Sequence, residues 1–233
     1  MTTGSTGAAP IRALIFDMDG LLIDSEPIAA RALGAFLRLH GRELRAGTME
    51  STLGRRLPEA MAIIAEAYGL TLPLADLTAT YDRLRLAALR GNLAPLPGAA
   101  ALLTFARVAG LRLALATSSL RTHADPSLAE TGLAGLFDAE ATGDEVARGK
   151  PEPDIFLLAA ERLGEPPAGC VVLEDAPAGL AAAAAAGMRR LWVPNEQTRG
   201  LPVSVPVDAE LPDLEAAIPW LQRHGVVAPA VPA

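Results

Sequence analysis

The hydrophobic positions of the chain form two alternating patterns. Short apolar runs suit buried parallel strands and lie at residues 13–16, 111–116, 136–141, 171–173 and 189–193. Segments with apolar residues at helical spacing lie at residues 27–39, 57–68, 77–89, 99–109, 127–131, 154–163, 178–186 and 214–223. Residues 92–98, rich in Pro, Gly and Asn, have the composition of a linker. The regular alternation after this linker predicts an α/β fold with a doubly wound parallel sheet.

Local signals add detail to two of these segments and to the N-terminus. Asp125 followed by Pro126 predicts a helix with Asp125 as its N-cap and Pro126 as its first residue. Six consecutive alanines, residues 181–186, lie between strand patterns and predict a helix packed closely on the sheet. Residues 1–10 are small and polar and lack the apolar core of a signal peptide, so we expect a disordered lead-in.

Composition narrows the class of protein. The 233 residues are 51% hydrophobic and 20% charged, which supplies a buried core and excludes a disordered chain. A net charge of −7 argues against a nucleic-acid partner, since that needs clustered Lys and Arg. No apolar stretch approaches the roughly 18 residues of a membrane span. The single cysteine, Cys170, heads an apolar run and is interpreted as a buried strand residue. It cannot form an intramolecular disulfide, so we expect a cytoplasmic protein. We also expect a monomer.

Acids and hydroxyls gather directly after three of the predicted strands. They are Asp17, Asp19, Thr117, Ser118, Glu174 and Asp175. Right-handed crossovers bring the carboxyl ends of such strands to one edge of the sheet, where ligands bind. Four acids there, with no obvious counter-charge, favour a hard divalent cation, Mg²⁺ above all. Taken alone, Asp17 and Asp19 also fit a polar turn; a calcium loop fits poorly, because a strand precedes them and Gly20 follows directly.

Two features suit an anionic ligand at the same edge. Thr117 and Ser118 offer hydroxyl and backbone N–H groups to an anionic oxygen. Lys150 is the only lysine among the 20 basic residues and lies in a loop before the helix at residues 154–163. An ammonium group on a long side chain can reach a phosphoryl group and offset its charge. The alternative for Lys150, a solvated loop lysine, is less consistent with these neighbours.

Four segments resemble the ordered motifs of the haloacid dehalogenase superfamily, in its β-phosphoglucomutase-like branch. They are residues 17–26 (DMDGLLIDSE), 117–119 (TSS), 149–153 (GKPEP) and 173–179 (LEDAPAG). The resemblance covers almost the whole chain. It implies a Rossmann-like core of residues 1–24 and 95–233, with a helical cap domain of residues 25–94 inserted after the first strand.

The resemblance also implies the reaction. Asp17 would be the nucleophile and would form an aspartyl-phosphate. Asp19 would act as general acid to the leaving oxygen and then as the base that activates water. Thr117 or Ser118, together with Lys150, would hold the phosphoryl oxygens.

A metal site and a substrate loop are implied in the same way. Mg²⁺ would be bound by Asp17, by the backbone carbonyl of Asp19 and by Asp175, with Glu174 as a ligand or as a partner of the ligands. Residues 52–56 resemble the family's cap loop for substrate. The residues expected to contact an anionic or sugar substrate are Gly54, Arg55, Arg56, Arg83 and Arg85. The three histidines lie outside every motif and receive no role: His40, His123 and His224.

The predicted function is hydrolysis of small phosphate monoesters, phosphosugars foremost. A sugar phosphomutase of the β-phosphoglucomutase type and a non-catalytic phosphometabolite-binding module are the alternatives. The module would not need both Asp17 and Asp19, and a dehalogenase would not need Asp19. β-Phosphoglucomutases carry a histidine at the start of the cap, where this chain has Ala29, and a Ser-Arg pair where it has Arg55 and Arg56. Both differences favour the phosphatase.

Overall fold

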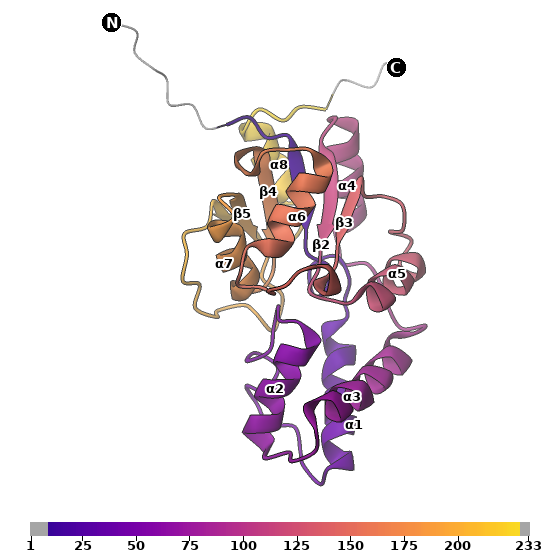
Figure 1. The fold of residues 1–233 in the computed structure, drawn as a ribbon. Helices are drawn as coiled ribbons and strands as arrows, with labels where there is room; N and C mark the ends of the chain where they lie inside the picture. Colours follow the sequence, from indigo (N-terminus) through magenta and orange to yellow (C-terminus); the bar gives the residue numbers. More distant parts are fainter. Residues whose placement is uncertain (1–8, 229–233) are drawn as a thin grey trace, which may run out of the picture.

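Strands and helices alternate through most of the chain (Figure 1). The computed structural model describes residues 9–228, so the first eight residues of the predicted lead-in lie outside it. The strands are β1 (Ala13–Phe16), β2 (Arg112–Ala116), β3 (Ala139–Ala141), β4 (Cys170–Glu174), β5 (Arg189–Trp192) and β6 (Ala209–Glu210). The helices are α1 (Glu26–Leu39), α2 (Leu57–Tyr68), α3 (Leu74–Leu89), α4 (Ala99–Val108), α5 (Arg121–Glu130), α6 (Asp154–Leu163), α7 (Pro177–Ala185) and α8 (Ala217–Arg223), with 3-10 turns η1 (Gly143–Glu145) and η2 (Pro167–Gly169).

The six strands form one parallel sheet in the order β3-β2-β1-β4-β5-β6. The chain winds outward from β1 to β3 and then returns to the other side of β1, so the winding direction reverses between β1 and β4. Phe16 at the end of β1 is level with Leu115 in β2 and Leu173 in β4. The predicted doubly wound sheet is confirmed, and the loops after these three strands meet at the point where such folds bind ligands.

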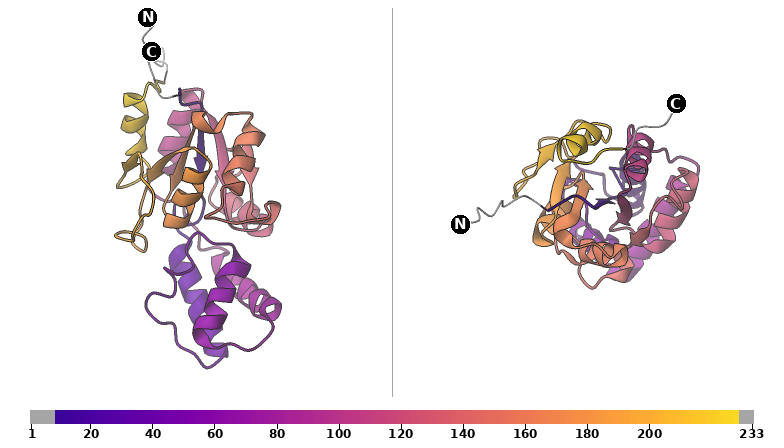
Figure 2. Two further views of the ribbon diagram at one scale, coloured as in Figure 1. Left: turned by 60° about the vertical axis from the view of Figure 1, so that its left-hand side comes forward. Right: turned by 90° about the horizontal axis from the view of Figure 1, so that it is seen from above.

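Helices cover both faces of the sheet (Figure 2). Leu14 and Phe16 of β1 pack in a cluster with α4 and α8, whereas Ala13 and Ile15 pack in a second cluster with α6 and α7. Burial on both faces explains why the strands are almost continuously apolar. The small side chains of α7 allow it to lie close to the sheet, as the run of six alanines predicts.

Helices α1, α2 and α3 form a separate bundle beyond the carboxyl ends of the strands (Figure 1). Phe36, Met61 and Tyr81 belong to its own apolar core. Two adjacent connections join the bundle to the sheet, and they pair with each other through an isolated bridge between Ile23 and Pro95. An inserted helical unit after β1 agrees with the predicted fold class. The predicted boundaries, 24/25 and 94/95, stay a prediction.

Helix α5 corrects one expectation. It begins at Arg121 rather than at Asp125, and Pro126 lies inside it. The N–H of Arg121 donates to Oδ1 of Asp144 (3.0 Å), which supplies an acceptor at the true helix start. Pro126 has no N–H group, so the helix lacks one backbone donor there. The helix nevertheless buries His123 before the proline and Leu128 after it.

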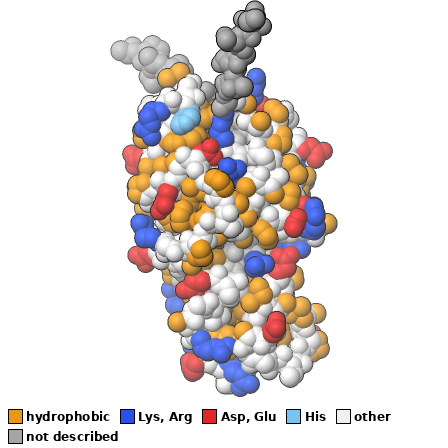
Figure 3. All heavy atoms as spheres, turned by 90° about the vertical axis from the view of Figure 1, so that its left-hand side faces the viewer, with side chains coloured by type: hydrophobic (Ala, Val, Ile, Leu, Met, Phe, Trp, Pro, Cys, Tyr) orange, Lys and Arg blue, Asp and Glu red, His pale blue; other side chains and the backbone are white. Residues whose placement is uncertain are grey.

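Smaller differences concern the edges of the sheet and the surface. Strand β3 is shorter than the predicted run at residues 136–141, and the two-residue β6 was not predicted. Cys170 is fully buried in β4, as expected. Among the helices within residues 9–228, none combines the length and apolar character needed to cross a membrane. On the face in Figure 3, basic and acidic side chains are interspersed, without a large basic patch.

Candidate active site

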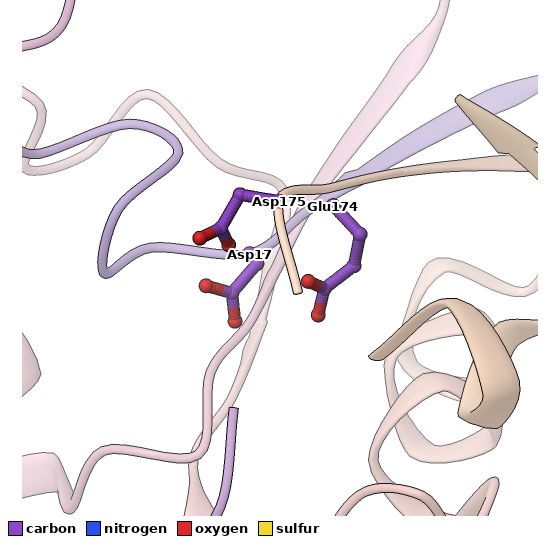
Figure 4. Close-up of side chains that lie close together, drawn as sticks. All are labelled: Asp17, Glu174 and Asp175. Atoms are coloured by element: carbon purple, nitrogen blue, oxygen red, sulfur yellow. The ribbon is translucent and has the colours of Figure 1, made fainter. Parts of the chain in front are cut away.

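Three buried carboxylates meet at the ends of β1 and β4 (Figure 4). Asp17 directly follows β1, Glu174 is the last residue of β4, and Asp175 comes next. One oxygen of each lies within 4.8 Å of the others. The backbone N–H of Asp17 donates to the carbonyl of Leu173 (3.2 Å), which ties the two strand ends together.

Lys150 contacts two of these acids, Asp17 and Glu174, and is fully buried. Its Nζ donates to Oδ1 of Asp17 (2.5 Å), to Oε1 of Glu174 (2.6 Å) and to the carbonyl of Ala116 (3.2 Å). All three ammonium hydrogens therefore have acceptors. The solvated-lysine interpretation is wrong, and so is the expectation that the acids lack a counter-charge.

Both oxygens of Glu174 already have partners. Oε1 accepts from Lys150, and Oε2 accepts from the backbone N–H of Ala176 (3.0 Å). Gly179 in α7 leaves the room for this carboxylate, because a Cβ there would lie 1.7 Å from Oε1. This geometry suits Glu174 to hold Lys150 in place; whether it is a ligand of the metal or a partner of the ligands stays a prediction.

One ammonium group, that of Lys150, faces three clustered carboxylates, so the acidic centre is only partly neutralised. Burial raises the pKa of Asp17 to about 8, with Lys150 acting in the opposite direction and Glu174 adding to the rise. Burial, followed by the charges of Glu174 and Asp17, raises the pKa of Asp175 well above its ordinary value. A bound divalent cation would offset these charges. Buried, clustered carboxylate oxygens fit Mg²⁺ by ligand type.

Asp19 follows Asp17 by two residues and is held by three donors. Its Oδ1 accepts from Oγ of Ser25 (2.7 Å) and from Nη2 of Arg85 (3.1 Å), and its Oδ2 accepts from Oγ of Ser119 (2.6 Å). Burial acts to raise the pKa of Asp19, but the charge of Arg85 and the two hydroxyl donors outweigh it and lower the pKa. Asp19 is therefore an ionised carboxylate here. Ser25 and Ser119 lie within motif segments, but the sequence did not single them out.

The two predicted phosphate-binding hydroxyls differ in their surroundings. Thr117 is buried at the pocket floor, and its Oγ1 accepts from the backbone N–H of Ser119 (3.1 Å). Ser118 also lines the pocket, but its Oγ donates to the carbonyl of Gly54 in the helical insert (2.7 Å). Ser118 thus joins the sheet unit to the predicted substrate loop.

The helical insert covers this centre and forms the other wall of the pocket. Three of the predicted substrate residues line it: Gly54, Arg55 and Arg85, the last on α3. Arg56 is not among the lining residues; it pairs with Glu59 (2.5 Å) and donates to the carbonyl of Val146 (3.0 Å).

Arg83, also on α3, is exposed and bonds only to the backbone of its own helix. Its side chain therefore does not contribute to the pocket wall.

Three further titratable side chains line the pocket and were not predicted: Glu26, His123 and Tyr81, whose pKa burial raises to about 12. Glu26 is the first residue of α1, and burial, with the charge of Asp19 adding, raises its pKa to about 7. His123 of α5 lies with Nε2 2.9 Å from Oδ1 of Asp82 in α3, and burial lowers its pKa. Glu26 ends the first motif segment, which was the available signal. Nothing local marked His123, because its place in the pocket depends on how α5 and α3 meet.

The structure thus combines a doubly wound parallel sheet, an acidic centre at its switch point and a helical insert above that centre. The sequence model of the haloacid dehalogenase-like hydrolases matches residues 11–187. The chain belongs to this family, as its four motifs predicted.

Known relatives cover almost the same length. The chain is 38% identical to protein CbbY of Rhodobacter capsulatus, over 89% of this chain and 95% of that protein. It is 32% identical to the phosphorylated carbohydrates phosphatase of Thermotoga maritima, over 78% and 84%. The crystal structure of a CbbY variant from Rhodobacter sphaeroides in complex with xylulose-(1,5)bisphosphate has a TM-score of 0.78 at 30% identity, over 88% and 95%.

Proposed function

We propose that this enzyme is a Mg²⁺-dependent phosphatase that hydrolyses small phosphate monoesters through an aspartyl-phosphate on Asp17. One observation carries the proposal: buried Lys150 holds Oδ1 of Asp17 at 2.5 Å, at the floor of a pocket that Asp19 also lines. Phosphoryl transfer needs positioning and charge neutralisation above all, and this arrangement offers both.

The chain's own residues would divide the work as follows. Asp17 has one oxygen fixed by Lys150, so its other oxygen can attack the phosphorus while the P–O bond to the substrate alcohol breaks. Thr117 would hold a phosphoryl oxygen, and the charge of buried Lys150 would offset the charge of the phosphoryl group. The anionic phosphate ester bound beside Asp19 would raise the pKa of this carboxyl, so that Asp19 takes up a proton. Asp19 would then give that proton to the departing alcohol oxygen and later take one from the water that cleaves the aspartyl-phosphate.

The metal belongs to the same site. Asp17 and Asp175, with the backbone carbonyl of Asp19, would hold Mg²⁺, which when bound offsets the charge of the acids and of the phosphoryl group. Glu174 would keep Lys150 in position rather than bind the ion directly.

A phosphosugar is the substrate class that the pocket favours. Its wall combines the cations Arg55 and Arg85 with the carboxylate of Glu26, a mixture suited to a molecule with both anionic and hydroxyl groups. One relative is named a phosphatase of phosphorylated carbohydrates, and another structure holds a sugar bisphosphate. We expect the enzyme to act in the cytoplasm, as a monomer, without a nucleic-acid partner.

The phosphomutase alternative receives less support from the pocket. Ala29, at the position where β-phosphoglucomutases have a histidine, lines the pocket with a methyl group that can neither donate nor titrate. We therefore expect water, rather than a second sugar hydroxyl, to take the phosphoryl group.

A panel of phosphorylated metabolites tests the proposal. Hexose and pentose monophosphates, a pentulose bisphosphate and an aryl phosphate would be incubated with enzyme, with and without Mg²⁺, and inorganic phosphate measured. We expect Mg²⁺-dependent release, fastest from sugar phosphates. Activity that persists after exhaustive chelation would exclude the metal. With β-glucose 1-phosphate and its 1,6-bisphosphate, efficient isomerisation with little free phosphate would favour the mutase.

A further inference from the structure

A side chain outside the four motifs reaches the acidic centre from the end of β5. Asn195 lies three residues beyond Trp192, the last residue of that strand. Its Nδ2 donates to Oδ2 of Asp175 (2.8 Å) and to the backbone carbonyl of Gly20 (3.1 Å). One amide group thus contacts both the loop after β1 and the loop after β4.

The loop that carries Asn195 fixes the orientation of this amide. Oδ1 of Asn195 accepts from the backbone N–H groups of Gln197 (2.9 Å) and Thr198 (3.1 Å). The backbone N–H of Asn195 donates to Oγ1 of Thr198 (3.0 Å), a residue that is fully buried. Because the oxygen is held by loop N–H groups, the NH₂ group must point to Asp175.

The packing around Asp175 leaves little freedom. Gly20 has φ of +82°, and a Cβ there would lie 2.7 Å from Oδ2 of Asp175 and 2.8 Å from Nδ2 of Asn195. Trp192 in β5 makes a second hydrogen bond to this residue, because its Nε1 donates to the backbone carbonyl of Asp175 (3.1 Å). Asp175 is therefore held through both its carboxylate and its backbone by the end of β5.

We propose that Asn195 is a positioning residue for the metal site. Its NH₂ group occupies Oδ2 of Asp175 and turns the carboxylate so that Oδ1 is the oxygen offered to a divalent cation. Groups that orient metal ligands in this way typically contribute 10–100-fold to metal affinity. The inference rests on the proposed function only in taking Asp175 as a Mg²⁺ ligand.

The test measures Mg²⁺ binding without catalysis. Isothermal titration calorimetry of the metal-free, full-length enzyme would compare the native chain with Asn195→Ala and Asn195→Ser. Serine keeps an acceptor for the loop N–H groups but is too short to reach Asp175. Both variants should bind Mg²⁺ about 10–100-fold more weakly. The control is Glu196→Ala, an exposed neighbour in the same loop, which should bind like the native chain.

The two variants separate a role at the metal from a role in the loop. If Asn195→Ser binds Mg²⁺ as tightly as the native chain, Asn195 only shapes its loop and the proposal is overturned. If Asn195→Ala fails to fold, Asn195→Ser decides alone. Saturating Mg²⁺ should restore most of the kcat of Asn195→Ser. A native chain that does not bind Mg²⁺ at all would instead refute the metal in the proposed function.

Discussion

Nη2 of Arg85, in helix α3, donates to Oδ1 of Asp19, in the loop after β1, over 3.1 Å. This contact joins the helical insert to the acidic centre. It also opposes the effect of burial on the carboxyl and keeps the pKa of Asp19 below its ordinary value. The protonation of Asp19, the proposed acid–base residue, therefore depends on a side chain of the helical insert.

Replacing Arg85 should change the titration of Asp19. In Arg85→Gln the positive charge is lost while burial remains, so the ionised form is less favoured and the pKa of Asp19 rises. A ¹³C NMR titration of the aspartate carboxyl carbons measures this shift. Arg83→Gln is the matched control, because Arg83 lies on the same helix but is exposed, and it should leave the titration unchanged. Equal Asp19 pKa values in Arg85→Gln and the native chain would contradict the electrostatic role of Arg85.

Lys150 should not be replaceable even by arginine. A planar guanidinium is bulkier than an ammonium and cannot satisfy the three acceptors that surround Nζ in a fully buried site. We expect kcat of Lys150→Arg to fall about 10²–10³-fold, which is about the effect of removing one group that stabilises a developing charge. Arg148→Lys, two residues away and exposed, should keep native kcat. Near-native turnover of Lys150→Arg would mean that the ammonium is not needed.

Gly179 should be intolerant of a methyl group. In Gly179→Ala the new Cβ would overlap the Glu174 carboxylate, so Glu174 must move and Lys150 loses a partner. We expect a destabilisation of about 1–3 kcal/mol, as for overpacking of a core, together with reduced kcat. Gly34→Ala in α1, where a Cβ would meet only Nη1 of Arg38 at 3.4 Å, should be neutral or stabilising. Urea unfolding and steady-state kinetics measure both effects, and equal stability of the two variants would contradict the packing argument.

The layout of the fold could be predicted because it depends on local patterns. The apolar run at residues 13–16 and the Gly-containing polar residues after it indicate a buried strand and its end without knowledge of the rest of the chain. Helix α5 shows the limit of this reasoning. The Asp125–Pro126 pair is a helix-start signal, yet the helix begins four residues before Asp125 and buries His123 and Ala124 in that added turn. Tertiary packing outweighed the local preference.

The candidate site was predictable where strand ends coincide with unusual residue types. Asp17, Glu174 and Asp175 each follow or end a strand, so parallel topology alone brings them together. Ser119 could not be distinguished from its neighbour Ser118, because only the loop's path decides which hydroxyl faces Asp19. Asn195 also follows a strand at the same edge, and that position was the signal available for it.

The central claim is that Asp17 carries the phosphoryl group. An aryl phosphate has a good leaving group, so Asp19→Asn should still form the aspartyl-phosphate but lack the base that promotes its hydrolysis, with turnover slowed by about 10²–10⁴-fold. The intermediate should then accumulate, and borohydride reduction after quenching would convert Asp17 to homoserine.

Peptide mass spectrometry of the reduced protein is the most direct test. We predict homoserine at position 17 in Asp19→Asn, only when both Mg²⁺ and aryl phosphate are present. The modification should be absent from the Asp17→Asn variant, which should also be inactive. Turnover by the native enzyme with no modification at Asp17, or with the phosphoryl group on a different residue, would contradict the mechanism.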